Sequence, residues 1–300
     1  MPISPHITVL GLGAMGSAFS ITLKHFGATV SVLRHLHSPS CPMTLIGPHF
    51  KWTHTSYPCA PNQFDWLIIA TKAHQVLTAL EPYRAHINSS TLIFLIQNGM
   101  GVLEAVKQQY PTANIVMISC LFGARSLTNQ CVQLSNSPQI KVGTLDPQLN
   151  QFLSGIADYF NDHGLNTTLT DDLTSTLQHK LIVNSTLNAL GALYNCNHAT
   201  LMKQHAELMY ALCRESTLIL NHIGFKPTPD DMWSSIQSLM PAIGENFSSM
   251  HQDIQKNRPT EINYINGYLV DVAHQHQVSC VLNCKLQKQI QDHHDTFTDP

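Results

Sequence analysis

Charged side chains are scarce in this sequence. They make up 12% of the 300 residues, whereas hydrophobic residues make up 43%. Soluble domains carry about 25% charged residues, and disordered chains and coiled coils need less apolar or more charged compositions, so both classes are excluded. The 16 Lys and Arg residues face 19 Asp and Glu residues, for a formal net charge of -3. Without a basic surplus to neutralise phosphates, we expect no nucleic-acid partner.

Long apolar runs are also absent. The longest run, around residues 115–124, reaches only half of the roughly twenty residues that a membrane-spanning helix needs. No Lys or Arg precedes Lys24, and glycines interrupt the first apolar stretch, so the layout of a secretory signal is missing. We therefore expect no membrane association and a cytoplasmic location.

The cysteines show no pairing pattern. The chain has 8 of them, without a C-x-x-C pair or the spacing of a disulfide framework, so we expect them to be reduced. Cys280 and Cys284 lie four apart with His274 and His276 just upstream, which would allow a metal site if this stretch were helical. Zinc motifs usually pair their ligands more tightly, so we predict no metal site.

The first half of the chain has the pattern of a parallel sheet with helices. Short runs rich in Val, Ile and Leu alternate with amphipathic stretches, as in successive strand and helix units. The strand candidates are residues 7–10, 29–33, 66–70, 92–96, 115–120 and 165–169. Residues 132–134 and 140–142, separated by Ser-Asn-Ser-Pro, further predict a hairpin that closes this half.

Beyond Thr170 the apolar residues take helical spacing. The pattern predicts one helix containing Leu173 to Leu187, a second over 203–223 stopped by Gly224, and others after Thr228 and from Glu261. The fold class is therefore α/β, with an N-terminal Rossmann-type dinucleotide-binding domain and an all-helical C-terminal domain. We place the first domain at residues 1–170 and the second at 171–300.

A glycine motif follows the first predicted strand. Its sequence is G-x-G-x-x-G, placed between a strand and a helix, and it comprises Gly11, Leu12, Gly13, Ala14, Met15 and Gly16. Gly11 permits a tight turn, Gly13 lets a pyrophosphate approach the backbone, and Gly16 allows close helix packing. The motif predicts a dinucleotide site, the alternative being a glycine-rich turn without a ligand.

Arg34 bears on the choice of dinucleotide. It follows the second predicted strand, where an NAD-specific site would carry Asp or Glu. A guanidinium there can make a forked contact with a 2′-phosphate, which favours NADP(H) over NAD(H). The alternative is a solvated Arg at a strand end.

A polar stripe marks the predicted helix after Thr170. Lys180, Asn184 and Asn188 follow at i, i+4 and i+8, so they share about one face of the helix. One amine and two amides suit a site for a small polar molecule, although a solvated helix face would explain the stripe equally well. Glu261 would lie in the first turn of another helix, where it complements the helix dipole without any substrate.

Together these stretches resemble the ketopantoate reductase (2-dehydropantoate 2-reductase) family. The motifs occur in family order over nearly the whole chain, and they lie at residues 11–16, 34, 70–73, 97–101, 179–184, 245–253 and 260–267. The glycine motif alone belongs to many dehydrogenases, so the resemblance depends on the set. It implies an NADPH-dependent reductase that converts a small 2-oxo acid, ketopantoate, to (R)-pantoate in pantothenate and coenzyme A biosynthesis.

The resemblance also implies roles for individual residues. Lys180 would be the general acid that protonates the ketone oxygen, and Glu261 would engage the hydroxyl side of the substrate. The substrate-binding residues would be Asn98, Asn184, Asn188, Asn246 and Ser249. Lys72 and Asn98 would lie beside the cofactor, together with the glycine motif and Arg34.

Other functions stay open on the sequence. The chain reads Asn195-Cys196-Asn197-His198-Ala199 where the family often carries Asn-Gly, which puts one substrate contact in doubt. A reductase of the same architecture could act on another 2-oxo acid or a larger carbonyl compound, since fold does not fix substrate. A non-catalytic NADPH-binding sensor is the alternative from a different class. The sequence does not specify an oligomeric state.

Overall fold

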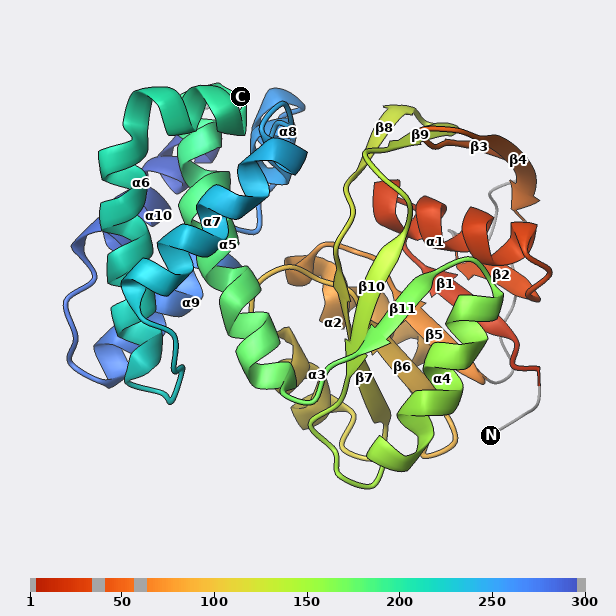
Figure 1. Ribbon diagram of the computed structural model, residues 1–300. Helices are drawn as coiled ribbons and strands as arrows, with labels where there is room; N and C mark the ends of the chain where they lie inside the picture. Colours follow the sequence, from red (N-terminus) through yellow and green to blue (C-terminus); the bar gives the residue numbers. More distant parts are fainter. Residues whose placement is uncertain (1–3, 34–40, 57–63, 296–300) are drawn as a thin grey trace. The chain divides into compact units, whose positions relative to one another are not determined.

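The computed structural model describes residues 4–33, 41–56 and 64–295 (Figure 1). The chain divides into two compact units, one of residues 1–97 with 102–174 and one of residues 98–101 with 175–300. The main junction therefore lies at Thr174 and Ser175, inside a helix. The segment 98–101 packs with the second unit, although the chain on both sides of it belongs to the first.

The first unit is built on a seven-stranded sheet of order β11-β10-β7-β6-β5-β1-β2. Its strands are β1 (Ile7–Leu10), β2 (Val30–Leu33), β5 (Trp66–Ile69), β6 (Leu92–Leu95), β7 (Asn114–Cys120), β10 (Gln139–Gly143) and β11 (Asn166–Leu169). The first five of these run parallel, as expected for a Rossmann-type domain. Only β10 pairs antiparallel with its neighbour β7, and β11 then runs parallel to β10. The α/β prediction for this half is confirmed.

A second sheet of four strands packs against the first helix of this unit. It has the order β4-β3-β9-β8 and consists of β3 (Cys41–Ile46), β4 (Lys51–Ser56), β8 (Ala124–Thr128) and β9 (Cys131–Leu134). Helix α1 (Ala14–His25) contacts all four of these strands, and its buried Phe19 and Ile21 join the same core as Met43 and Leu45. The remaining helical elements of the unit are η1 (Ala73–Gln75), α2 (Val76–Leu80), η2 (Glu81–His86), α3 (Val102–Gln109) and α4 (Asn150–Asp162).

The predicted hairpin of residues 132–134 and 140–142 is wrong. β9 belongs to the four-stranded sheet, where it pairs with β3 and β8, while β10 belongs to the seven-stranded sheet. The Ser-Asn-Ser-Pro loop therefore connects two sheets. Local turn chemistry permits both arrangements, and the choice is made by distant partners, since β9 pairs with residues 44–46 and β10 with residues 117–120.

The second unit is helical, as predicted. Its helices are α5 (Leu173–Leu193), α6 (His198–Asn221), α7 (Pro229–Ile243), α8 (Ser249–Gln255), α9 (Ile262–Gln275) and α10 (Val281–Asp295). α6 begins earlier than expected because the side chain of Asn197 accepts a hydrogen bond from the Thr200 N–H at 2.8 Å and caps it. α7 begins with a capping box between Thr228 and Asp231. Buried side chains of α5, α6 and α9, such as Ile182, form a core separate from that of the first unit.

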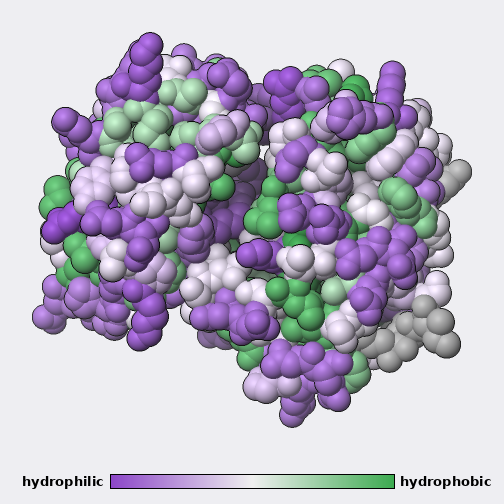
Figure 2. All heavy atoms as spheres, in the orientation of Figure 1, coloured by the Kyte–Doolittle hydropathy of each residue, from purple (hydrophilic) through white to green (hydrophobic). Residues whose placement is uncertain are grey.

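The face shown in Figure 2 is largely hydrophilic even though few residues of the chain are charged. Within residues 4–33, 41–56 and 64–295, no helix combines the length and apolarity that crossing a bilayer requires.

Candidate functional site

The glycine motif forms the turn between β1 and α1, and its three glycines answer to different constraints. Gly11 has φ +98°, and a Cβ atom there would lie 2.8 Å from the backbone nitrogen of Thr71. A Cβ atom on Gly16 would meet the carbonyl oxygen of Gly11. A Cβ atom on Gly13, by contrast, would have nothing within 4 Å. Gly11 and Gly16 are therefore required by packing, whereas Gly13 leaves open space at the helix start.

The N-terminus of α1 is suited to an anion. Gly13 is its N-cap, no side chain caps the helix, and the first turn contains no acidic residue. The first N–H groups of a helix have no partner within it, and the helix dipole places partial positive charge there. With the open space in front of Gly13, these groups can bind a phosphate.

Neighbouring strand ends bring further residues to the same edge of the sheet. Leu10 at the end of β1 pairs in register with Leu33 of β2 and Ile69 of β5, so their carboxyl ends are level. The side chain of Gln97 after β6 donates to the carbonyl oxygens of Ile69 at 2.7 Å and Thr71 at 3.1 Å. Ligands of open α/β sheets bind beside such carboxyl ends, where the strand order reverses around β1.

Lys72 is the predicted cofactor residue that the structure describes. It is half-buried and forms the N-cap of η1, directly after the Thr71 that abuts Gly11. Arg34, the residue on which the choice between NADP(H) and NAD(H) depends, lies outside the described residues.

Asn98 and Glu261 are brought together within the second unit. The side-chain amide of Asn98 donates a long hydrogen bond, 3.5 Å, to Oε2 of Glu261. The segment that carries Asn98 docks onto the start of α9, since the Met100 N–H donates to the carbonyl oxygen of Tyr264 at 2.9 Å. Gly99 has φ +83°, and a Cβ atom there would meet that same carbonyl oxygen. A glycine is thus required for this contact.

The carboxylate of Glu261 is buried but does not cap its own helix. Glu261 precedes α9 as its N-cap residue, with 5% of its surface exposed, and its side chain makes no capping hydrogen bond. The dipole interpretation of Glu261 explains its position in the sequence, but a buried carboxylate with a side-chain amide as hydrogen-bond partner also suits a ligand site. The loop before it is held by Arg258, which forms a 3.0 Å ion pair with the buried Asp253 of α8.

The stripe on α5 runs from a half-buried part of the helix into a buried part. From residue 181 to residue 192 every side chain is buried except Val183 and Asn184, which are half-buried like the adjoining Lys180. Asn188, one turn further along, has only 7% of its surface exposed. A fully solvated helix face, the simpler interpretation of the stripe, does not describe these residues. An amine and an amide lie at the edge of a hydrophobic core.

Asn246 and Ser249 lie on either side of the cap of α8. Asn246 is half-buried, and its backbone carbonyl accepts a hydrogen bond from the His198 N–H at 3.2 Å. Ser249 is the first residue of α8 and is exposed. The neighbouring Ser248 caps the helix and donates its hydroxyl to the carbonyl oxygen of Asn188 at 3.1 Å. That bond joins the start of α8 to the stripe on α5.

Sequence reasoning missed a buried polar network that fixes α5. Asn266 of α9 donates to the carbonyl oxygen of Ser185 at 3.3 Å and to Oδ1 of Asn283 at 2.9 Å. Asn283 in turn donates to Glu215 at 2.9 Å and to Ser216 at 3.2 Å. Because Ser185 is adjacent to Asn184, this network sets the position of the stripe. In the sequence, the available signal for this network was an Asn on an apolar helix face. Both Asn266 and Asn283 are fully buried in the structure.

The loop that departs from the family pattern is structurally defined. Asn195 has φ +50°, a conformation that Asn tolerates better than most residues, and its side chain accepts a hydrogen bond from Gln255 at 3.1 Å. His198 is buried, and burial lowers its pKa, partly offset by the hydrogen bond to the Ile243 carbonyl oxygen. The lowered pKa keeps His198 neutral, so it adds no cation to the site.

Comparisons with known proteins agree with the motifs. Family profiles described as "Ketopantoate reductase PanE/ApbA" and "Ketopantoate reductase PanE/ApbA C terminal" match residues 7–147 and 172–293. The 2-dehydropantoate 2-reductase of Vibrio cholerae is 29% identical over 297 residues, covering 95% of this chain and 96% of that protein.

Solved structures share the fold. A D-mandelate dehydrogenase with NADH and anilino(oxo)acetate has a TM-score of 0.90 at 22% identity, covering 97% of this chain and 99% of that one. A ketopantoate reductase from Ralstonia eutropha JMP134 has a TM-score of 0.85 at 18% identity, with the same coverage of both chains.

Proposed function

Because the chain belongs to the ketopantoate reductase family, we propose that it reduces 2-dehydropantoate to (R)-pantoate with NADPH. The relative from Vibrio cholerae, which covers nearly the whole chain, carries the name of this reaction. The observation that carries the proposal is the placement of Lys180 and Asn184 at the only part of α5 between residues 180 and 192 that is not fully buried. The product would feed pantothenate and coenzyme A biosynthesis.

Lys180 is the proposed proton donor. A bound reduced nicotinamide would supply a hydride to the ketone carbon, and negative charge would develop on the ketone oxygen. The Lys180 ammonium group protonates that oxygen, so the ketone becomes a secondary alcohol with one hydride and one proton added. Asn184 and Asn188 would donate hydrogen bonds to the substrate from the same helix face.

Glu261 is the proposed partner of the substrate hydroxyl. Its carboxylate can accept a hydrogen bond from that group, and the amide of Asn98 holds one of its oxygens. Asn246 and Ser249, beside the cap of α8, are proposed as further polar contacts of the substrate. Burial of Glu261 strengthens its hydrogen bonds relative to water.

For the cofactor we propose NADPH, with its pyrophosphate at the N-terminus of α1. The turn from Gly11 to Gly16, including the backbone of Leu12, Ala14 and Met15, would cradle the phosphates, and Lys72 and Asn98 would lie nearby. Arg34 would hold the 2′-phosphate.

Replacing Arg34, as in Arg34→Ala, should weaken NADPH binding at least tenfold and leave NADH binding nearly unchanged. An equal loss for both cofactors would reject this role.

A second candidate function is reduction of another 2-oxo acid. The highest TM-score among the structures compared above belongs to a D-mandelate dehydrogenase, whose bound anilino(oxo)acetate carries an aromatic ring and a carbonyl group next to a carboxylate. Residues 195–199 also depart from the family pattern at one substrate contact, which favours a different substrate. The third alternative, a non-catalytic NADPH sensor, would bind the cofactor without turnover on any carbonyl compound.

One assay separates these functions. Oxidation of NADPH by the purified protein is followed with 2-dehydropantoate and with a panel of straight-chain, branched and aromatic 2-oxo acids. We expect the highest kcat/KM for 2-dehydropantoate. A higher value for phenylglyoxylate would favour the mandelate-type function, and cofactor binding without any turnover would leave the sensor as the explanation.

A further inference from the structure

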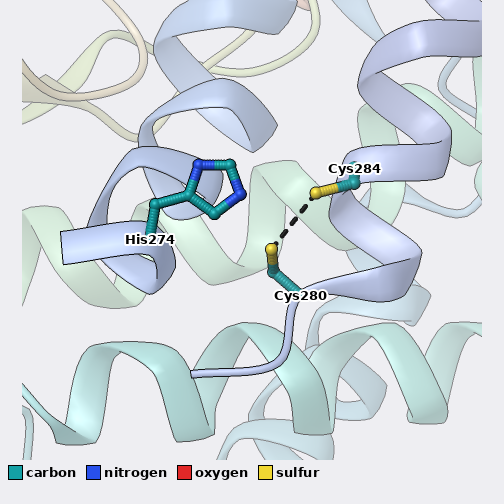
Figure 3. Close-up of side chains that lie close together, drawn as sticks. All are labelled: His274, Cys280 and Cys284. Atoms are coloured by element: carbon teal, nitrogen blue, oxygen red, sulfur yellow. Dashed lines mark hydrogen bonds between the residues drawn. The ribbon is translucent and has the colours of Figure 1, made fainter. Parts of the chain in front are cut away.

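We propose that His274, Cys280 and Cys284 form a binding site for a thiophilic metal ion, Zn²⁺ in the first instance. One ligand atom of each residue lies within 4.8 Å of the other two. Figure 3 shows the two sulfur atoms facing each other, with a ring nitrogen of His274 on the side towards them. The site lies wholly in the second unit and is independent of the proposed reductase activity.

The helix hairpin of α9 and α10 creates this cluster. His274 lies in the last turn of α9, Cys280 directly precedes α10, and Cys284 follows one turn later on the same face. Gln277 turns the chain with φ +55°, and the Val278 N–H donates to the carbonyl oxygen of Ala273 at 2.8 Å. Residues ten apart in the sequence thereby reach one point.

The start of α10 is fixed independently of the cluster. Glu215 of α6 accepts hydrogen bonds from the N–H groups of Leu282 at 2.9 Å and Asn283 at 2.8 Å. These bonds cap α10 from another helix and hold the turn between Cys280 and Cys284. The backbone that carries the two cysteines is thus held by contacts outside the ligand cluster, which reduces the cost of ordering the site on binding.

The distances suit tetrahedral coordination. The Sγ atoms of Cys280 and Cys284 lie 3.1 Å apart. Two sulfurs at about 2.3 Å from a tetrahedral Zn²⁺ lie about 3.8 Å from each other. The sulfurs would therefore separate by less than about 1 Å, a shift within the reach of side-chain rotation at the exposed end of a helix.

The donor set selects the class of metal. Two thiolates and an imidazole suit Zn²⁺ and other soft or borderline ions, while Mg²⁺ and Ca²⁺ require oxygen ligands. His274 is exposed, so a water molecule can complete the coordination as a fourth ligand. Both thiols must lose their protons when they bind a metal ion.

Sequence spacing led us to expect no metal here, because the ligand pairs are wider than in common zinc motifs. The side-chain placement now argues for the opposite proposal. A disulfide between Cys280 and Cys284 would also explain the short distance between their sulfur atoms. It would not explain why His274 lies beside them. The test therefore has to distinguish metal binding from disulfide formation.

The experiment uses the full chain, metal-free and kept reduced with a phosphine under nitrogen. Co²⁺ serves as the spectroscopic probe, followed by displacement with Zn²⁺ and measurement of the Zn²⁺ affinity against a chelator. We expect one equivalent of Co²⁺ to produce thiolate-to-cobalt charge-transfer absorption, which one equivalent of Zn²⁺ removes. Protons should be released to the buffer on binding.

Matched variants locate the site. Cys284→Ser and His274→Gln change half-buried or exposed ligands and should weaken Zn²⁺ binding about 100-fold or more without unfolding the helices. Cys196→Ser and His276→Gln are the controls, a half-buried cysteine and an exposed histidine of the same unit outside the cluster, and should bind as the wild type does. Absence of cobalt–thiolate absorption would overturn the proposal, as would equal losses in the controls.

A second measurement distinguishes the metal site from a disulfide. The protein is oxidised in air with and without Zn²⁺. Mass spectrometry then reports whether a disulfide has formed between Cys280 and Cys284. Protection of both thiols by Zn²⁺ supports the metal site. A Cys280–Cys284 disulfide that forms at the same rate with and without Zn²⁺ would contradict it.

Discussion

Glu261 and Asn98 are far apart in the sequence, and the 3.5 Å hydrogen bond between them exists because residues 98–101 dock onto the start of α9. Family motifs identified both residues but could not indicate that they meet. The bond depends on the positive φ of Gly99 and on the carbonyl oxygen of Tyr264, neither of which a local pattern reveals.

A substitution at Glu261 tests its role at the scale of one residue. Glu261→Gln keeps the size of the side chain and the hydrogen bond to Asn98, but removes the charge. We expect kcat/KM for 2-dehydropantoate to fall about 10²-fold, because a neutral amide is a weaker acceptor for the substrate hydroxyl. NADPH affinity should not change.

Glu245→Gln is the matched control, since Glu245 is exposed and bonded to Asn197 at 3.4 Å. It should behave as the wild type does. Wild-type kinetics in Glu261→Gln would show that the carboxylate serves the fold alone.

At the scale of elements, two glycines of the same turn are expected to serve different purposes, Gly16 the packing of α1 and Gly13 the binding of the cofactor. Gly16→Ala places a Cβ atom against the carbonyl oxygen of Gly11, and we expect it to lower the free energy of unfolding by about 1–3 kcal/mol. Gly13→Ala meets no atom and should change stability by less than about 1 kcal/mol. It should nevertheless weaken NADPH binding at least tenfold, because the methyl group enters the space that the pyrophosphate would use.

Denaturant unfolding and fluorescence titration with NADPH measure the two effects separately. If Gly13→Ala bound NADPH as tightly as the wild type, the anion would not lie in front of this helix.

Elements differ in how far their sequences define them. The buried strand Trp66–Ile69 is recognisable because its apolar run is short and contains branched and aromatic residues, which favours a strand over a helix. The strand Lys51–Ser56 has a mixed polar sequence and acquires its place by pairing with residues 41–46, which no local pattern encodes. The polar network of Asn266 and Asn283 was missed for the same reason, since its partners come from four helices.

At the scale of the whole molecule, buried histidines should make stability depend on pH. Burial lowers the pKa of His198 below the ordinary 6.5, and partial burial lowers that of His251. In the first unit, partial burial and the nearby His25 and Lys24 lower the pKa of the half-buried His54. A lowered pKa in the folded state means that the unfolded chain takes up protons first as the pH falls. The stabilisation is therefore complete above about pH 6.5 and is lost as the pH drops towards the folded pKa values.

His198→Asn tests this account, because the amide can keep the hydrogen bond to the Ile243 carbonyl oxygen. We expect the melting temperature of the wild type to fall between about pH 7.5 and 5.5, and the variant to lose less over the same interval. His276→Gln, at an exposed position, should follow the wild type. Identical pH profiles for His198→Asn and the wild type would remove His198 as a cause.

Lys180 is the residue on which the proposed chemistry of the whole molecule depends. The most direct measurement compares turnover with NADPH binding in Lys180→Ala, using Lys203→Ala, an exposed lysine of α6, as the control. We predict that Lys180→Ala loses about 10²- to 10⁴-fold in kcat while binding NADPH as the wild type does. Undiminished turnover of 2-dehydropantoate in that variant would contradict the proposal that Lys180 is the proton donor.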